Sequence, residues 1–186
     1  MKKIPTMFER DWEGDRSRVL NKPHPDCDWV FLGDGVATIK LDGSCCMIRG
    51  GRLYKRRELK GGTVPDGFEL VDHDEETKKT VGWMPVVGGP EDKYHLEALE
   101  RVDGSLPDGT YELVGPKVQG GAEHYAKHTL IPHGMIKPIE SPPRTFDALR
   151  NWMNGQDIEG LVFHHPDGRM AKIKLRDFGL KRNPPR

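Results

Sequence analysis

Short segments in which apolar and polar residues alternate recur along most of the chain, and glycines and prolines separate them. Alternation with a period of two is typical of strands that bury one face of a sheet. Gly50-Gly51 and His165-Pro166-Asp167-Gly168 are turn signals, so we expect hairpins around them. The pattern predicts strands at 36–40, 44–49, 52–57, 110–114, 130–131, 160–164 and 170–175.

Two longer segments, 90–102 and 145–154, carry apolar residues at the spacing of a helix, with Thr145 at an N-cap position. Such stripes are typical of helix sides that face a core. Strands outnumber helices and do not alternate with them strictly. The predicted fold class is therefore α+β, with mostly antiparallel sheets and flanking helices. The stripe residues are Tyr94, Ala98, Leu99 and Val102 in the first segment, and Phe146, Leu149, Trp152 and Met153 in the second.

The length of 186 residues and the 35% apolar content predict one domain with a real core, over residues 1–180, and a loose basic tail at 181–186. The chain has no apolar run of 18 residues and no apolar stretch after its first residues, so we expect neither a membrane span nor a signal peptide. Cys27, Cys45 and Cys46 suit reduced, packed thiols. These features favour a cytoplasmic monomer.

The formal net charge is zero, but the charges are segregated along the sequence. Residues 1–60 hold 13 Lys/Arg and 9 Asp/Glu, residues 61–112 hold 4 and 13, and residues 113–186 hold 12 and 7. If the first and last segments meet in the fold, they form a basic region suited to nucleic acid. The acidic run at 72–76 predicts a solvated loop.

Lys40-Leu41-Asp42-Gly43 is the first candidate for chemistry. A lysine amine in water has a pKa of about 10.4, so a nucleophilic lysine needs desolvation or nearby cations. Asp42 would hold the ammonium or accept hydrogen bonds from the turn, and Gly43 would let the backbone pass close to a ligand. Taken alone, the string is equally typical of a surface lysine beside a hairpin turn.

Further charged motifs follow Lys40 in a defined order: 54–57, 111–120, 159–163 and 172–174. Their sequences are Tyr54-Lys55-Arg56-Arg57, Tyr111-Glu112-Leu113-Val114-Gly115-Pro116-Lys117-Val118-Gln119-Gly120, Glu159-Gly160-Leu161-Val162-Phe163 and Lys172-Ile173-Lys174. With these motifs the chain resembles, over roughly residues 8–176, the ATP-dependent RNA ligases of the covalent nucleotidyltransferase superfamily. That superfamily also holds DNA ligases and mRNA capping enzymes, and the likeness is greatest to small single-domain RNA ligases.

The resemblance implies a nucleotidyltransferase (ATP-grasp-like) adenylylation domain and a three-step reaction. Lys40 would attack the α-phosphate of ATP to give lysyl-AMP, and AMP would pass to an RNA 5′-phosphate. A 3′-OH would then displace AMP and join the ends. Lys172 and Lys174 would contact phosphate oxygens, where negative charge develops.

The resemblance also implies roles for five further residues. Glu159 would help to hold Mg²⁺, with Mn²⁺ as a possible substitute, and Glu112 would bind the ribose or assist the metal. Arg56, rather than Arg57, would grip the ribose or a 5′-phosphate. The hydroxyl of Thr38 and the backbone of Ile39 are candidates for adenine recognition. The eight histidines form no metal-binding pattern, and we assign none a role.

Three alternatives to an RNA ligase stay open: a DNA ligase core, a guanylyltransferase-type capping enzyme, and a non-catalytic RNA- or nucleotide-binding module of the same fold. Only 12 residues follow Lys174, so we expect no OB-fold domain of the kind that DNA ligases and capping enzymes carry. The joint presence of Lys40, Glu112, Glu159, Lys172 and Lys174 argues against a non-catalytic module.

Overall fold

A computed structural model of the chain describes residues 2–61, 63–75 and 78–183. The chain divides into two compact units. The central unit comprises Met1–Lys3 and Asp42–Met135, and the terminal unit comprises Ile4–Leu41 and Ile136–Arg186. The boundary between Leu41 and Asp42 lies inside the Lys40–Gly43 motif. The single domain at 1–180 stays a prediction, and residues 184–186 of the predicted tail lie outside the described part.

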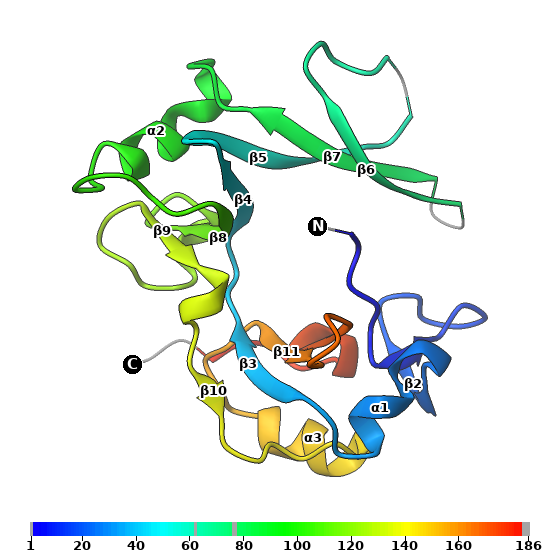
Figure 1. Cartoon of the computed structure of the whole chain (residues 1–186). Helices are drawn as coiled ribbons and strands as arrows, with labels where there is room; N and C mark the ends of the chain where they lie inside the picture. The colour runs from blue at the N-terminus through cyan, green and yellow to red at the C-terminus, as the bar shows by residue number, and fades with distance from the viewer. Residues whose placement is uncertain (1, 62, 76–77, 184–186) are drawn as a thin grey trace. The chain divides into compact units, whose positions relative to one another are not determined.

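The central unit is built on a six-stranded sheet in the order β6-β7-β5-β4-β8-β9, with every neighbouring pair antiparallel (Figure 1). Its helix α2 (Lys93–Leu99) follows the 3₁₀ turn η2 (Pro90–Asp92). The shorter 3₁₀ turns η3 (Gln119–Gly121) and η4 (His133–Met135) follow β8 and β9. The strands are β4 (Ser44–Arg49), β5 (Arg52–Leu59), β6 (Glu69–Asp74), β7 (Lys79–Pro85), β8 (Gly109–Val114) and β9 (Thr129–Pro132).

The two faces of the central sheet carry different residues. Cys46, Leu53 and Tyr111 are buried against Ala98 of α2 in one apolar cluster, and we call this side the helix face. Successive strand residues point to opposite sides, and directly paired residues share a side. Glu112 therefore lies on the other side, which we call the Glu112 face.

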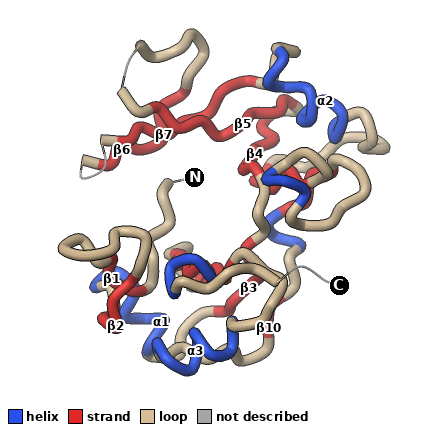
Figure 2. The backbone as a smooth tube through the Cα atoms, turned by 180° about the vertical axis from the view of Figure 1, so that it is seen from behind, coloured by secondary structure: helices blue, strands red, loops and turns tan. Residues whose placement is uncertain are grey.

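The terminal unit contains a four-stranded antiparallel sheet in the order β10-β3-β11-β12 and a separate hairpin, β1-β2. Helices α1 (Asp28–Phe31) and α3 (Phe146–Met153) lie side by side in both views (Figures 1 and 2). The 3₁₀ turns are η1 (Pro25–Cys27) and η5 (Leu175–Phe178). The strands are β1 (Phe8–Arg10), β2 (Val19–Pro23), β3 (Val36–Lys40), β10 (Pro138–Ile139), β11 (Gly160–His164) and β12 (Met170–Lys174).

The core of the terminal unit covers one face of its sheet. Ala37, Leu161, Phe163 and Ile173 are almost fully buried and belong to one cluster with Leu149 of α3. The opposite face carries the alternate residues of the same strands, including three lysines. We call it the lysine face, and it follows directly from the period-two pattern of the sequence.

The fold class predicted from the sequence, α+β with mostly antiparallel sheets, is confirmed, and every predicted strand is present. The pattern missed β1, β2, β6, β7, β10 and α1. The predicted loop at 72–76 is wrong, because residues 72–74 belong to β6, while Glu76 lies outside the described residues. β6 is an edge strand, so its backbone pairs with β7 while charged side chains can stay in solvent.

The two predicted helices are present in shortened form. The segment 90–102 is a 3₁₀ turn followed by α2, and the predicted burial of Leu99 is wrong, since it is the last helical residue and 36% exposed. The predicted burial of Ala98 is confirmed, and His95, which was not in the predicted stripe, is buried as well. In α3 the predicted stripe lies in the core, and Thr145 occupies the N-cap position without a capping hydrogen bond from its side chain.

The basic sequence segments do meet, because β3 lies between β10 and β11. The segregation of charge is nevertheless largely lost on folding. The terminal unit contains 15 Lys/Arg and 13 Asp/Glu in the sequence, and the central unit contains 14 and 16. Within the described ranges, none of the helices has the length and apolar content needed to cross a bilayer.

Candidate functional site

On the lysine face of the terminal sheet, Lys40 and Lys174 flank the same glycine. Gly160 of β11 pairs with Lys40 of β3 on one side and with Lys174 of β12 on the other. Thr38, Val162 and Lys172 form the next row across the same strands. Three residues predicted to act on phosphate, Lys40, Lys172 and Lys174, therefore lie on one face of three adjacent strands.

Glu159 joins the two lysines of the first row. Lys40 Nζ donates to Glu159 Oε2 at 2.5 Å, and Lys174 Nζ donates to the other carboxylate oxygen. The three side chains are 22%, 14% and 16% exposed for Lys40, Glu159 and Lys174. One carboxylate thus holds two ammonium groups in a mostly buried cluster, which we call the Lys–Glu–Lys cluster.

The charge state of Glu159 follows from its neighbours. Burial raises the pKa of the Glu159 carboxyl, but the charges and hydrogen bonds of Lys40 and Lys174 outweigh burial and hold the pKa below its usual value. Glu159 is therefore ionised near neutral pH. The backbone reinforces this geometry, because Leu175 N donates to Glu159 O at 2.9 Å and Lys174 N donates to Asp177 Oδ2 at 2.9 Å.

Gly160 has no side chain for a steric reason. A Cβ at this position would collide with the carbonyl oxygen of Ile173 and lie 2.8 Å from Cα of Lys174. A larger residue would therefore push β12 away from β11 and separate Lys174 from Glu159. This explains why a glycine follows the glutamate in the Glu159-Gly160 motif.

The candidates for adenine recognition, Thr38 and Ile39, lie on opposite faces of β3. Thr38 is 7% exposed, and its Oγ1 lies 2.9 Å from Nε2 of His164. The side chain of Ile39 packs against the core cluster of the terminal unit, so only its backbone could meet a ligand. The backbone of Lys172 is fixed by Met7 N and Pro5 O, each at 2.9 Å.

Glu112 occupies the middle of β8 in the central unit and is 8% exposed. His133 Nε2 lies 2.9 Å from Glu112 Oε2, and His133 Nδ1 lies 2.9 Å from Thr110 Oγ1. The imidazole therefore spans two residues on the same face of one strand. The sequence assigns no role to His133, and its only sequence signal is its place two residues after the predicted strand at 130–131.

Gly43 packs directly against the Glu112 strand. A Cβ at Gly43 would collide with the carbonyl oxygen of Leu113 and lie 2.7 Å from Cγ of Glu112. Asp42 N donates to Glu123 Oε1 at 2.9 Å, and Gln119 Nε2 donates to Gly43 O at 3.4 Å. The loop after β8 thus holds the Asp-Gly turn, and Gly43 allows a close approach to β8, while its predicted approach to a ligand stays a prediction.

Arg56 shares the Glu112 face. Tyr54 pairs with Met47, and Glu112 pairs with Cys45, so residues 54 and 56 of β5 lie on the same side as Glu112. Arg57 points to the other side and is exposed, whereas Arg56 is partly buried. A hollow of about 410 Å³ is lined by Lys55, Arg56, Arg57 and Glu91. Lys55 is neutralised there by Glu91 at 3.2 Å and Asp92 at 2.5 Å.

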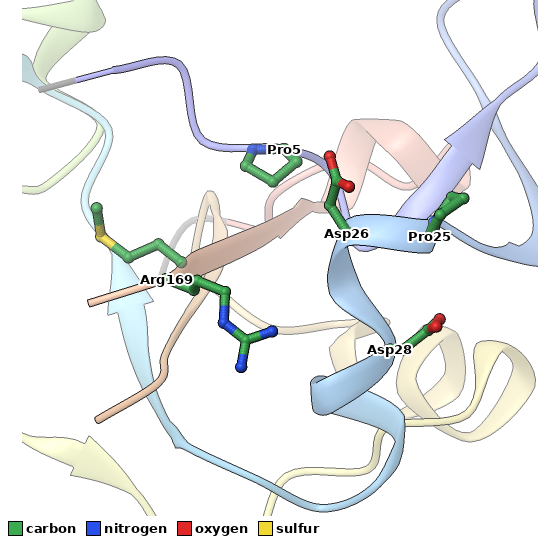
Figure 3. A pocket seen from close by; sticks show the side chains of 6 residues that line it. Pro5, Pro25, Asp26, Asp28 and Arg169 are labelled. Carbon is green, nitrogen blue, oxygen red and sulfur yellow. The ribbon is translucent and has the colours of Figure 1, made fainter. Parts of the chain in front are cut away.

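A further pocket of about 600 Å³ lies in the terminal unit, where Asp26 and Asp28 come from η1 and α1, and Arg169 comes from the β11–β12 turn (Figure 3). Pro5, Pro25 and Met170 complete its lining. None of the residues predicted to bind nucleotide or metal lines it. Its two carboxylates and one guanidinium make a mixed surface that does not resemble a phosphate site.

The structure brings Lys40, Glu159 and Lys174 into contact and places Lys172 on the same face. It places Glu112 and Arg56 together on one face of the central sheet. Among the described residues, no group of three or more His, Cys, Asp or Glu side chains could hold a metal ion. The arrangement can therefore bind phosphate through lysines and present one amine beside a carboxylate.

Comparison with known proteins identifies the family. A model of the RNA ligase 1 family matches residues 73–185, a range that begins after Lys40 and includes Glu112, Glu159, Lys172 and Lys174. RNA ligase 1 of Danio rerio is 31% identical over 154 residues, covering 69% of this chain and 46% of that protein. RNA ligase 1 of Pongo abelii is 32% identical over 99 residues, covering 49% and 30%.

RNA ligase 1 of Mus musculus is 23% identical over 222 aligned residues, covering 79% of this chain and 68% of that protein. The chain spans about half the length of the Danio rerio protein. Because the family model covers more than half of the chain, the chain belongs to the RNA ligase 1 family. The resemblance to RNA ligases that the motifs indicate is thereby confirmed.

Proposed function

We propose that this chain is an ATP-dependent RNA ligase that joins a 5′-phosphate to a 3′-OH through a covalent lysyl-AMP on Lys40. The observation that carries the proposal is the Lys–Glu–Lys cluster on the lysine face. It provides one amine, held in a defined place by Glu159 Oε2 at 2.5 Å, with a second lysine on the same carboxylate. Membership of the RNA ligase 1 family supports the choice of RNA as substrate.

In the first step, the lone pair of Lys40 Nζ forms a bond to the α-phosphorus of ATP, and the bond from that phosphorus to the bridging oxygen breaks. Pyrophosphate leaves with the bonding pair. The amine must lose its protons in this step, and Glu159 Oε2 is the acceptor nearest to it. Lys174 and Lys172 would contact the phosphate oxygens on which negative charge develops.

The second and third steps transfer AMP and seal the strand. An oxygen of the RNA 5′-phosphate attacks the AMP phosphorus, the P–N bond breaks and the Lys40 amine is restored. The 3′-OH then attacks the 5′-phosphorus, loses its proton, and AMP leaves. RNA with a 5′-OH cannot enter this sequence, because it has no phosphate to accept AMP.

Mg²⁺, or Mn²⁺ in its place, would accompany ATP. The described residues contain no cluster of three side chains that could hold a metal by themselves. That fits Mg²⁺, which keeps most of its waters and binds through one or two carboxylates and the substrate phosphates. Because both oxygens of Glu159 accept from lysines, Glu159 suits contact through water, and Glu112 is the second candidate. The bound ion would neutralise phosphate charge.

The remaining predicted residues would bind the nucleotide or the RNA end. Glu112 would accept hydrogen bonds from the ribose hydroxyls, and Arg56 would grip the ribose or a 5′-phosphate. Thr38 and the backbone of Ile39 would recognise adenine. The burial of Thr38 beside His164 supports a fixed hydroxyl at that position.

The test is incubation with α-³²P-labelled ATP and Mg²⁺, followed by a denaturing gel. Wild type should retain label, and Lys40→Arg, which keeps the charge but removes the nucleophile, should retain none. Lys22→Arg is the matched control, because Lys22 lies in the same unit and is 65% exposed. Equal labelling of wild type and Lys40→Arg would refute the proposal. Joining of 5′-phosphate RNA, compared with the same ends in DNA, tests the substrate class.

A further inference from the structure

The hydrogen bonds around Glu112 form a defined chain in the central unit. Thr110 and Glu112 lie two residues apart on β8, so both point to the same face. His133 begins η4 directly after β9, and Pro132 of β9 pairs with Tyr111. The backbone register therefore places the imidazole over both side chains, with each nitrogen 2.9 Å from its partner.

The chemistry of the three groups sets the direction of these bonds. An ionised carboxylate can only accept, so His133 Nε2 carries a hydrogen and donates to Glu112 Oε2. In a neutral imidazole the other nitrogen is then an acceptor, so the Thr110 hydroxyl donates to His133 Nδ1. Each group thus fixes the orientation of the next.

The two oxygens of the Glu112 carboxylate therefore have different surroundings. Oε2 of Glu112 is held by His133, while Oε1 lies on the side of Gly43, 3.1 Å from where a Cβ of that residue would be. Gly43 belongs to the same motif as Lys40. A glutamate has three rotatable side-chain bonds, so such fixing removes much of the freedom that ligand binding would otherwise have to restrict.

We propose that His133 is a positioning residue that aims the carboxylate of Glu112 at the nucleotide. The inference rests on the proposed function of Glu112 in nucleotide binding. His133 acts through Glu112 and is not itself required to touch the nucleotide. Thr110 completes the arrangement by holding the far side of the imidazole.

The experiment measures the affinity for AMP by calorimetry, together with KM for ATP and kcat of self-adenylylation. His133→Leu removes both polar nitrogens at similar size, and should raise the Kd for AMP and the KM for ATP about tenfold, with kcat little changed. His133→Gln retains an N–H donor for Glu112 and should recover most of the affinity. His73→Leu is the matched control, because His73 contacts Thr80 in the same way at 2.8 Å, on the edge strand β6.

The pair His133→Leu and Glu112→Ala separates positioning from direct binding. If His133 acts through Glu112, the double variant should bind AMP as weakly as Glu112→Ala alone. Additive losses, an unchanged Kd in His133→Leu, or a failure of His133→Gln to recover affinity would overturn the inference, as would a wild type that does not bind AMP. Melting temperatures check that each variant is folded.

The role of His133 and the ligase mechanism can fail independently in these experiments. A wild-type protein that binds AMP with the expected pattern of variants but never labels itself would refute the ligase mechanism and leave the role of His133 standing. A protein that labels itself on Lys40 but shows additive losses would do the reverse.

Discussion

The lysine face of the terminal sheet and the Glu112 face of the central sheet each place a glutamate among polar partners, and the partners differ. Glu159 accepts from two lysines, whereas Glu112 accepts from a histidine. Glu159 therefore belongs to a cluster with two ammonium groups, and Glu112 belongs to a hydrogen-bond chain with an imidazole and a hydroxyl. Under the proposed function, the first face would govern bond formation and the second would govern nucleotide affinity.

The largest expected effect on the rate of self-adenylylation comes from Glu159→Gln, which tests the role assigned to the lysine face. The substitution removes the negative charge that Lys40 and Lys174 share and replaces one acceptor oxygen by an NH₂ donor, so neither ammonium keeps an oppositely charged partner. We expect the rate of self-adenylylation to fall about 10²- to 10³-fold, which is typical for loss of one electrostatic group. Single-turnover labelling at saturating ATP measures this rate.

Glu140→Gln is the matched control, since Glu140 is an exposed glutamate of the same unit. A Glu159→Gln protein with an unchanged rate and a raised KM would show that the Lys–Glu–Lys cluster contributes binding rather than chemistry. The assigned difference between the two faces would then be wrong.

An intermediate effect is expected for Arg56→Ala, with Arg57→Ala as its matched control. The two arginines are adjacent on β5 but point to opposite sides of the sheet. Loss of a charged hydrogen bond to ribose or phosphate should raise KM about 10- to 100-fold for Arg56→Ala, with little change in kcat. Steady-state kinetics of self-adenylylation and of sealing separate the two parameters. An equal effect of both variants would contradict the assignment of ribose or phosphate binding to Arg56 rather than Arg57.

The smallest effect concerns the helix face, which should affect stability and not chemistry. His95 is 8% exposed, and among the described residues neither ring nitrogen has a hydrogen-bond partner. Burial lowers the pKa of His95, the nearby Asp92 opposes this shift, and Lys55 adds to it. Because the pKa of His95 is lower in the folded than in the unfolded state, the unfolded state binds the proton at a higher pH.

The stability that His95 contributes is therefore complete above the ordinary histidine pKa of about 6.5 and is lost as pH falls below it. Denaturant unfolding of wild type and His95→Phe between about pH 7 and pH 5 tests this. The wild type should lose more stability than the variant over this range. An equal loss of unfolding free energy in both proteins would show that His95 does not cause the pH dependence of stability.

The sequence predicted the strands that carry the site because each is a short apolar-rich segment bounded by turn signals. Burial alternates along 170–174, whereas 160–163 is buried at every position and Ala37 and Thr38 are both buried, so the pairing of the strands is also needed to define the lysine face. β6 was missed because three of its six residues are acidic, and an edge strand has no need for apolar side chains on either side. Pairing with β7, which no local pattern encodes, makes it a strand.

The order of charged motifs predicted which residues matter but not how they pair. The contact of Lys40 with Glu159 spans 119 positions in sequence, and the register of β3 against β11 sets it. The pairing of His133 with Glu112 likewise depends on β9 meeting β8. Lone histidines carry no signal of their own, so this contact could be found only from the fold.

The central claim is that Lys40 is the amine that receives AMP. Its most direct test is to incubate the protein with ATP and Mg²⁺, digest it, and locate the AMP adduct by mass spectrometry under conditions that spare the acid-labile P–N bond. The account predicts one AMP per chain, on the peptide that contains Lys40, and no adduct in Lys40→Arg. An adduct on Lys172 or Lys174, or a wild-type protein that carries none, would contradict it.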